Sequence, residues 1–269
     1  LARVTLSLHR TLSSCMVSTE KWEIFSQEVL PVENADRFPD AGLIVAAAGS
    51  SVRFGAGQSK LLTDLNGRPL FCHCLNALAP CFPVEHVRLM VPPGQEHRFA
   101  EHLQGCAAFR SVQLLEGGAS RQLSVAKGIA SFPPEVAVVA IQDAARPFPT
   151  PELLRRCIEQ ARAVGSGVAA KRAGDTIKVA DDSGRVESTP DRSKLWQVET
   201  PQVFDRHAIE DAYKELIRQG KEVTDDAQAL EQAGKPVYLV EHAEINIKIT
   251  YPADLALARL ISKGEASRR

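Results

Sequence analysis

The sequence predicts an α/β fold built on a doubly wound, mostly parallel sheet, and three observations support this class. From residue 42 onward, short apolar segments alternate with segments of helical periodicity. The apolar segments are nearly continuous, as expected for strands that are covered on both faces of a parallel sheet. Residues 175–197 instead alternate apolar and polar side chains around the turn sequence DDSG. This pattern predicts a β-hairpin arm that protrudes from the main sheet.

In the first half of this unit, each predicted strand is followed by a helix. Apolar runs predict strands at residues 42–48, 86–92 and 112–117 and at the start of 136–147. Helical spacing predicts helices at residues 69–79, 94–104, 121–132 and 150–164. The last helix has Thr150 as its predicted N-cap, immediately ahead of a proline.

The second half breaks this rhythm once. A strand at 165–171 precedes the hairpin, and two helices follow near 206–219 and 224–233, the second with Thr224 as its predicted N-cap. Apolar segments at 236–241 and 246–250, the latter a predicted strand, lead to a closing helix from Pro252. Two interpretations of the hairpin remain open: a surface excursion without a role, or an arm that reaches a second subunit.

Length and charge limit the functional classes. The 269 residues fit one large domain or two small ones, and 44% hydrophobic and 24% charged residues are ordinary for a globular protein. The formal net charge of −1 gives no basic field that would attract nucleic acid or an anionic membrane. We find no apolar run of about 18 residues and predict no membrane span. Any bound anion must therefore be held by a local site.

Six cysteines occur, and one cluster invites a zinc interpretation. In FCHCLNALAPC the candidate ligands are Cys72, His73, Cys74 and Cys81. The same stretch has helical spacing, and on a helix Cys72 and Cys74 point in diverging directions. We therefore favour buried helix cysteines over a metal site, and a reduced, cytoplasmic compartment.

The N-terminal 40 residues are left out of the fold prediction. They contain Arg, Ser and Thr but no acid before Glu20, a composition typical of transit peptides, and the chain opens on Leu. A plastid transit peptide and an overextended reading frame both remain open. We expect a poorly ordered tail over residues 1–40 and a domain over residues 41–265.

The stretch GLIVAAAGSSVRFGAGQSK, residues 42–60, is unusual because an apolar run is followed by residues with very small side chains and then by two cations. It matches neither the G-x-G-x-x-G nor the Walker pattern. The small residues at 46–51 would let backbone N–H groups approach phosphate oxygens, with Arg53 and Lys60 at the edges. Because it follows a strand, it predicts a nucleotide site; the alternative is a surface turn with solvated charges.

Further motifs carry weaker signals. EGGASRQLSVAKG, residues 116–128, joins two glycines to a helix start, with a hydroxyl at Ser124. In QDAARP, Asp143 follows a buried strand and is a candidate Mg²⁺ ligand; alternatively, an Asp143–Arg146 pair stabilises the turn. Lys248 alternates with isoleucines in NIKIT, a pattern that by itself indicates a solvent-facing side chain.

Taken in order, these motifs resemble one family. AAAGSSVRFG…SK, GGASRQLSV, DAARP, DTIK, DRSKLW, TPQVF, TDDA and NIKIT.P.DL, spread over about residues 42–260, are similar to the 2-C-methyl-D-erythritol 4-phosphate cytidylyltransferase family. The resemblance implies an α/β nucleotidyltransferase domain that dimerises through an arm at about residues 172–200. It also implies transfer of CMP from CTP to a sugar-alcohol phosphate, with release of pyrophosphate, in the non-mevalonate pathway.

The resemblance also implies the roles of individual residues. Arg53 and Lys60 match the cations that stabilise the transition state, and Arg192 and Lys248 match the pair that positions the acceptor phosphate. The remaining matches are Ala47, Ala48, Gly49, Gly118 and Ser124 around the nucleotide, Asp143 near Mg²⁺, and Arg146, Thr176, Thr200 and Thr224 around the acceptor. Since Arg192 and Thr176 fall in the arm, we expect them to act on the neighbouring subunit's site.

This chain departs from the family at several positions, and two alternatives follow. Ser59-Lys60-Leu61 stands where Pro-Lys-Gln is usual, and Gln142 stands where His is usual. The Ser-Lys-Leu variant is also similar to molybdenum-cofactor nucleotidyltransferases. One alternative is a ribitol-5-phosphate cytidylyltransferase; the other is a non-catalytic nucleotide-binding protein on a decayed fold. The cations retained at all four catalytic positions favour an enzyme.

Overall fold

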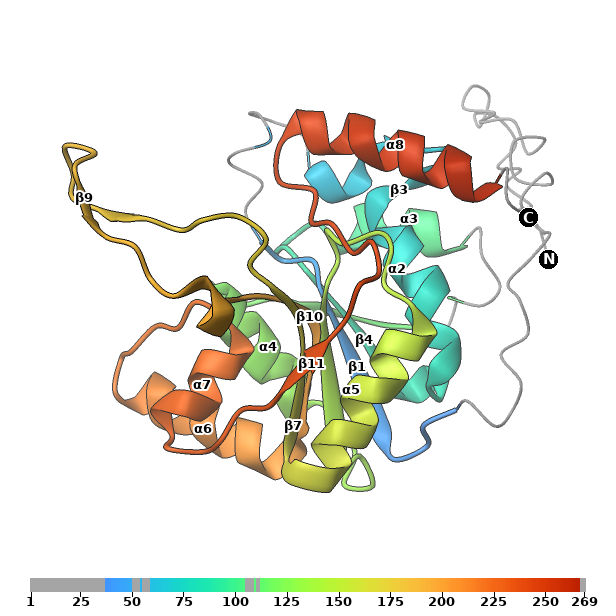
Figure 1. Ribbon diagram of the computed structural model, residues 1–269. Helices are drawn as coiled ribbons and strands as arrows, with labels where there is room; N and C mark the ends of the chain where they lie inside the picture. Colours follow the sequence, from blue (N-terminus) through green and yellow to red (C-terminus); the bar gives the residue numbers. More distant parts are fainter. Residues whose placement is uncertain (1–36, 50–53, 55–58, 105–108, 110–111, 267–269) are drawn as a thin grey trace, which may run out of the picture. The chain divides into compact units, whose positions relative to one another are not determined.

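The computed structural model describes residues 37–49, 54, 59–104, 109 and 112–266, and its centre is a seven-stranded sheet of order β11-β7-β10-β6-β1-β4-β5 (Figure 1). The strands are β1 (Ala41–Ala46), β4 (Val87–Val91), β5 (Gln113–Glu116), β6 (Val138–Asp143), β7 (Ser166–Arg172), β10 (Trp196–Asp205) and β11 (Leu239–Glu241). All neighbouring pairs are parallel except those of β10, which runs antiparallel to both β6 and β7. The predicted mostly parallel sheet is confirmed, and the reversed strand β10 is a feature that the sequence patterns did not predict.

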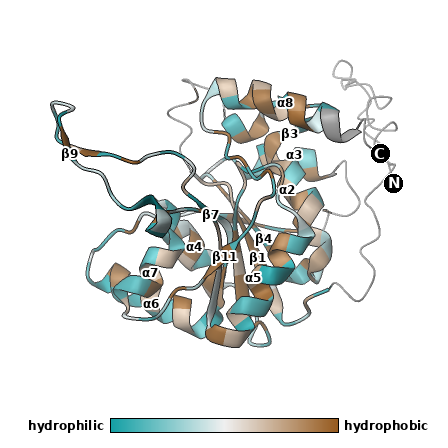
Figure 2. Ribbon diagram, viewed as in Figure 1, coloured by the Kyte–Doolittle hydropathy of each residue, from teal (hydrophilic) through white to brown (hydrophobic). Residues whose placement is uncertain are grey.

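Helices cover both faces of this sheet, as Figures 1 and 2 show. They are α2 (Leu70–Leu78), α3 (Glu96–Gln104), α4 (Arg121–Ala130), α5 (Pro151–Val164), α6 (Arg206–Arg218), α7 (Asp226–Gln232) and α8 (Pro252–Ala266). In β1, Leu43 and Val45 join the core beneath α2, α3, α5 and α8, whereas Ile44 joins the core beneath α4, α6 and α7. This alternation, with period two along a strand that is buried on both faces, confirms the doubly wound class.

Short elements connect these layers. They are the 3₁₀ turns η3 (Lys60–Leu62), η4 (Ala79–Cys81), η5 (Val84–His86) and η7 (Arg192–Lys194), the ladder of β2 (Asp64–Leu65) with β3 (Arg68–Pro69), and the ladder of β8 (Val179–Ala180) with β9 (Val186–Ser188). In the part of the chain that the structure describes, no helix combines the length and apolar character that a membrane crossing requires.

Helix starts agree with the sequence at one position and differ at another. The Thr150 hydroxyl accepts a 3.1 Å hydrogen bond from Leu153 N, so the predicted cap of α5 is confirmed. The predicted cap of α7 is wrong: Asp225, not Thr224, accepts from Gln228 N at 2.9 Å. A carboxylate at the N-cap satisfies the same free amide and also interacts favourably with the helix dipole.

The predicted strand at 246–250 is also wrong. This segment belongs to no sheet ladder. It is extended, and Ile249 N donates a 2.9 Å hydrogen bond to Ala145 O in the loop after β6. Its alternating isoleucines therefore reflect packing of this segment against the hydrophobic core, and not the pairing of a further edge strand with the sheet.

The predicted β-hairpin is present as β8 and β9, which pair antiparallel around the DDSG turn. Within the turn, Asp181 N donates to Arg185 O, and Gly184 N donates to Asp181 O. Nearly all of residues 174–194 are exposed, and Figure 1 shows this arm projecting from the sheet. At its base, the Arg172 guanidinium lies 4.3 Å from the centre of the Trp196 ring.

The described cysteines are buried, as expected for helix packing. Cys72 and Cys74 lie on α2, Cys81 follows it and Cys157 lies on α5. Burial raises the pKa of Cys157 to about 12, so it is a thiol at neutral pH. Most of the predicted tail, residues 1–36, lies outside the described residues, whereas Phe38 packs in the core 6.2 Å from the ring of Phe82.

Candidate active site

The predicted site residues that the structure describes gather mainly at the carboxyl end of β1 and β6. Asp143 closes β6, and its neighbour in register is Ala46, the last residue of β1. The small residues Ala47, Ala48 and Gly49 follow at once. Open α/β sheets bind ligands at this edge, because strand carboxyl ends and the loops after them converge there.

Two loops, after β1 and after β5, lie against each other at this end of the sheet, where the sequence predicts a nucleotide cradle. Ala47 N donates to Met90 O and Gly117 N donates to Val91 O, both at 2.8 Å, so β4 holds both loops. A Cβ on Gly117 would stand only 2.4 Å from the Ala48 Cβ. The close approach of these backbones therefore requires glycine at position 117.

Ser124 shapes the second of these loops. Its hydroxyl accepts a 2.9 Å hydrogen bond from Gly118 N and donates to Ser120 O at 2.8 Å. Ser120 is the N-cap of α4, since its side chain accepts from Leu123 N at 3.2 Å. The Ser124 hydroxyl thus fixes the glycine loop to the start of the helix.

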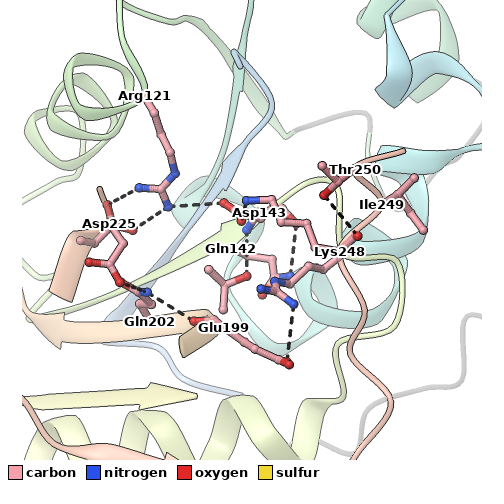
Figure 3. A network of polar contacts seen from close by, with 12 residues as sticks. Arg121, Gln142, Asp143, Glu199, Gln202, Asp225, Lys248, Ile249 and Thr250 are labelled. Atoms are coloured by element: carbon pink, nitrogen blue, oxygen red, sulfur yellow. Dashed lines mark hydrogen bonds and ion pairs between the residues drawn. The ribbon is translucent and has the colours of Figure 1, made fainter. Parts of the chain in front are cut away.

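Asp143 is the centre of the polar network in Figure 3. Its Oδ2 accepts a 2.6 Å hydrogen bond from Lys248 Nζ, and its Oδ1 lies 3.4 Å from Arg121 Nη2. Its backbone N donates to the Thr200 hydroxyl at 3.1 Å. Burial opposes ionisation of this carboxyl, but the charges of Arg121 and Lys248 outweigh it and hold its pKa below the usual range.

Lys60, which is far from Lys248 in the sequence, lies at the same carboxyl end of the sheet. Its ammonium donates a 2.7 Å hydrogen bond to Ile249 O, next to Lys248 in the sequence. Lys248 is therefore not simply solvent-facing, because its side chain, 43% exposed, forms an ion pair with Asp143. The two lysines bring positive charge to one edge of the sheet, where phosphates would be held.

Arg146 connects two segments of this site through its side-chain contacts. Its guanidinium donates to Asn246 O at 2.6 Å and lies 3.5 Å from Glu199. Asn246 in turn donates to Glu199 Oε2 at 2.9 Å and to Thr200 O at 2.7 Å. The buried Arg146 thus joins the segment of Lys248 to β10. The alternative interpretation of QDAARP holds in part: Arg146 N donates to Asp143 O at 3.1 Å across the turn and the Arg146 charge helps to lower the pKa of Asp143, but among the described residues the ion pair of its guanidinium is with Glu199.

Some predicted site residues lie elsewhere. Arg192 and Thr176 are exposed on the arm, and Arg192 donates to Gly174 O at 2.9 Å. Among the described residues, no hydrogen bond or ion pair joins either to Asp143 or Lys248. Thr224 is exposed, and its backbone N donates to the Gln228 side chain at 2.7 Å. Arg53 lies outside the described residues.

The sequence patterns did not single out four polar residues of this network: Arg121, Asp226, Glu199 and Asn246. Each stands inside or beside a quoted motif, and each is buried or partly buried in the network. For Arg121, Asp226 and Glu199 the signal was the charge itself, since acids and arginines next to buried strands require partners. Some of their partners lie far along the chain, 105 residues away for Arg121 and Asp226 and 47 for Asn246 and Glu199, so these pairings were not readable from local spacing.

Asp143 is the residue that could hold a divalent cation here. In the described part of the chain, no cluster of three or more His, Cys, Asp or Glu side chains is arranged for a metal. Mg²⁺ often takes one or two carboxylates and fills its remaining positions with substrate phosphates and water. A single ionised carboxylate at the end of β6 fits that mode of binding, in which substrate phosphates supply other ligands, rather than a dedicated protein cage.

Comparison with known proteins agrees with this geometry. The family described as 2-C-methyl-D-erythritol 4-phosphate cytidylyltransferase matches residues 42–263. The enzyme of that name from Synechocystis sp. is 39% identical over 219 residues, covering 81% of this chain and 95% of the relative, and that from Trichormus variabilis is 37% identical, covering 81% and 96%.

Solved structures show the same fold. The 2-C-methyl-D-erythritol 4-phosphate cytidylyltransferase of Thermus thermophilus superposes with a TM-score of 0.69 at 30% identity, covering 82% of this chain and 98% of that one. The 4-diphosphocytidyl-2C-methyl-D-erythritol synthase of Anaerococcus prevotii gives 0.70 at 26% identity, covering 85% and 99%. The chain belongs to the 2-C-methyl-D-erythritol 4-phosphate cytidylyltransferase family.

Proposed function

We propose that this chain transfers CMP from CTP to 2-C-methyl-D-erythritol 4-phosphate, giving 4-diphosphocytidyl-2-C-methyl-D-erythritol and pyrophosphate. The observation that carries the proposal is the convergence of Lys60, Asp143 and Lys248 at the carboxyl end of β6. Membership of the family supplies the identities of the two substrates.

The reaction needs positioning and charge more than covalent chemistry. An oxygen of the acceptor phosphate bonds to the α-phosphorus of CTP, and the bond from that phosphorus to the bridging oxygen breaks, its electrons leaving on pyrophosphate. Two anions must approach each other, so cations around the phosphorus lower the barrier. Lys60 and Arg53 would serve the nucleotide, and Lys248 would serve the acceptor phosphate. No general base is needed, because the attacking phosphate is already ionised.

A divalent cation belongs to this proposal through Asp143. When bound, Mg²⁺ would neutralise charge on the phosphates of CTP. The low pKa of Asp143 keeps this carboxylate ionised across the neutral range. Contacts with Lys248 and Arg121 hold the Asp143 carboxylate in place at the end of β6.

We also infer that the arm completes the site of a second copy of the chain. The arm exposes the apolar side chains of Val179 and Val186, which are 43% and 53% accessible, and such side chains favour burial against a partner. Arg192 and Thr176, the predicted acceptor contacts on the arm, lie exposed on the same arm. A dimer in which the arms are exchanged would place them at the partner's Lys248.

The test is a substrate comparison. Purified protein is incubated with Mg²⁺, CTP and either 2-C-methyl-D-erythritol 4-phosphate or ribitol 5-phosphate, and pyrophosphate release is measured. We expect turnover with the former and little with the latter. Preference for ribitol 5-phosphate would instead assign the alternative cytidylyltransferase, and CTP binding without turnover of either acceptor would indicate a non-catalytic nucleotide-binding protein.

A further inference from the structure

An ion pair between a partly buried arginine and a fully buried aspartate, which the proposed chemistry does not use, lies beside the site. Arg121, the first residue of α4, donates to Asp226, the first residue of α7, at 2.9 Å and 2.7 Å in a bidentate contact. Asp226 is fully buried and also accepts a hydrogen bond from the Tyr213 hydroxyl. A buried carboxylate of this kind requires a fixed cation, so Arg121 is held firmly in place.

The same guanidinium also faces Asp143. Arg121 Nη2, which donates to Asp226 Oδ2, lies 3.4 Å from Asp143 Oδ1, while Lys248 holds Asp143 Oδ2 at 2.6 Å. Figure 3 shows Arg121 and Lys248 approaching Asp143 from opposite sides. Charges therefore alternate along the row Asp226, Arg121, Asp143, Lys248, and each oxygen of Asp143 has its own cation.

Arginine suits this place for a geometric reason. Its planar fork can hold one carboxylate with two nitrogens and still present an N–H to a second carboxylate. A lysine would supply one point charge and could not hold both acids in fixed orientations. If Arg121 lost its contact with Asp143, Lys248 would be the remaining cation among the described residues in contact with that carboxylate, and the acceptor phosphate would have to compete with Asp143 for Lys248.

We propose that Arg121 is a positioning residue: fixed by Asp226, it holds one oxygen of Asp143 and thereby sets how strongly Asp143 retains Lys248. This inference rests on the proposed function, in which Lys248 binds the acceptor phosphate. Arg121 itself touches neither substrate in this role. Its effect is on the affinity for the acceptor more than on the affinity for CTP.

A purely structural role for Arg121, as the partner of buried Asp226, is the competing explanation. The double variant Arg121→Gln/Asp226→Asn separates the two, because it removes both charges of the pair together and leaves hydrogen-bonding groups in their place. Melting temperature reports the structural role. KM for the acceptor, compared with KM for CTP, reports the positioning role.

We expect the double variant to fold, with kcat/KM for the acceptor lower by roughly 10- to 100-fold, as for other residues that orient a site carboxylate. Most of this loss should appear as a raised acceptor KM. Wild-type constants in the folded double variant would overturn the proposal. Should it fail to fold, Arg121→Lys keeps a charge beside Asp226, and the same loss is expected; wild-type constants there would equally overturn it.

Two controls complete the design. Tyr213→Phe removes the other hydrogen bond to Asp226 without touching Asp143, so it should lower the melting temperature and leave both KM values unchanged. A raised acceptor KM in Tyr213→Phe would show that any loosening of Asp226 suffices, against the proposal. Wild-type protein assayed in parallel tests the proposed function separately, since its inactivity would refute that function and not the role of Arg121.

Discussion

The ammonium group of Lys60 donates a hydrogen bond of 2.7 Å to the backbone carbonyl of Ile249, 189 residues further along the chain. This contact joins the residue that ends the glycine-rich stretch to the segment that carries Lys248. The two substrates must come within bonding distance of each other, so the segments that bind them must be held at a fixed relative position. The hydrogen bond from Lys60 to Ile249 is one way to fix this relative position.

Replacing Lys60 by Ala should lower turnover by roughly 10²–10³-fold, because a cation that stabilises developing charge in a water-poor site contributes about 3–4 kcal/mol. The melting temperature should change little, since Lys60 is only partly buried. Initial rates of pyrophosphate release give the measurement. Lys235→Ala, at an exposed position, is the matched control. Near-normal turnover in Lys60→Ala would remove this residue from the mechanism.

Replacing Lys248 by Met should mainly raise the KM for the acceptor. A charge-assisted hydrogen bond contributes about 1.5–3 kcal/mol, so kcat/KM for the acceptor should fall by roughly 10- to 100-fold. Methionine keeps the length and apolar stem of the side chain, and the comparison isolates the charge. If CTP affinity falls and acceptor affinity is retained, Lys248 serves the nucleotide and our assignment is wrong.

Mixing two inactive variants tests the shared site. Lys60→Ala disables the body of a subunit, and Arg192→Ala disables its arm. In a mixed dimer with exchanged arms, one of the two sites combines an intact Lys60 with an intact Arg192, so random mixing should restore about a quarter of wild-type activity. If each arm served its own subunit, no site in the mixture would be intact, and activity would stay at the level of the separate variants.

Local sequence patterns predicted the structural features that depend on contacts between residues close together in the sequence. The alternation of Leu43, Ile44 and Val45 and the cap at Thr150 depend on contacts that periodicity and capping chemistry describe. The reversal of β10 was not predictable, because an apolar run reads the same in either direction. The Arg121–Asp226 pair was missed for a related reason: 105 residues separate its members, and only the packing of α4 against α6 and α7 brings them together.

His73, a histidine on α2 that the proposed chemistry does not use, should make stability depend on pH. His73 Nε2 lies 2.8 Å from Leu65 O, and burial, together with the charge of Arg68, lowers its pKa below the ordinary value of 6.5. The unfolded chain therefore takes up the proton first, and the free energy of unfolding falls as pH drops through about 6.5. His73→Gln should show a smaller loss of melting temperature between pH 7.5 and about 5.5.

An equal loss of melting temperature in wild type and His73→Gln would show that other groups control acid stability.

Gly117→Ala tests the contact between the two loops of the cradle. The new methyl group would stand 2.4 Å from the Ala48 Cβ and 2.8 Å from the Ser124 hydroxyl, so the loops must separate. Overpacking of this kind costs about 1–3 kcal/mol, and we expect KM for CTP to rise by roughly tenfold or more. Adding Ala48→Gly removes the closer of the two clashes and should recover part of the loss. Acceptor KM should change much less, because the clashes at position 117 involve neither Lys248 nor Asp143. An unchanged KM for CTP in Gly117→Ala would mean that the nucleotide is not held between these loops.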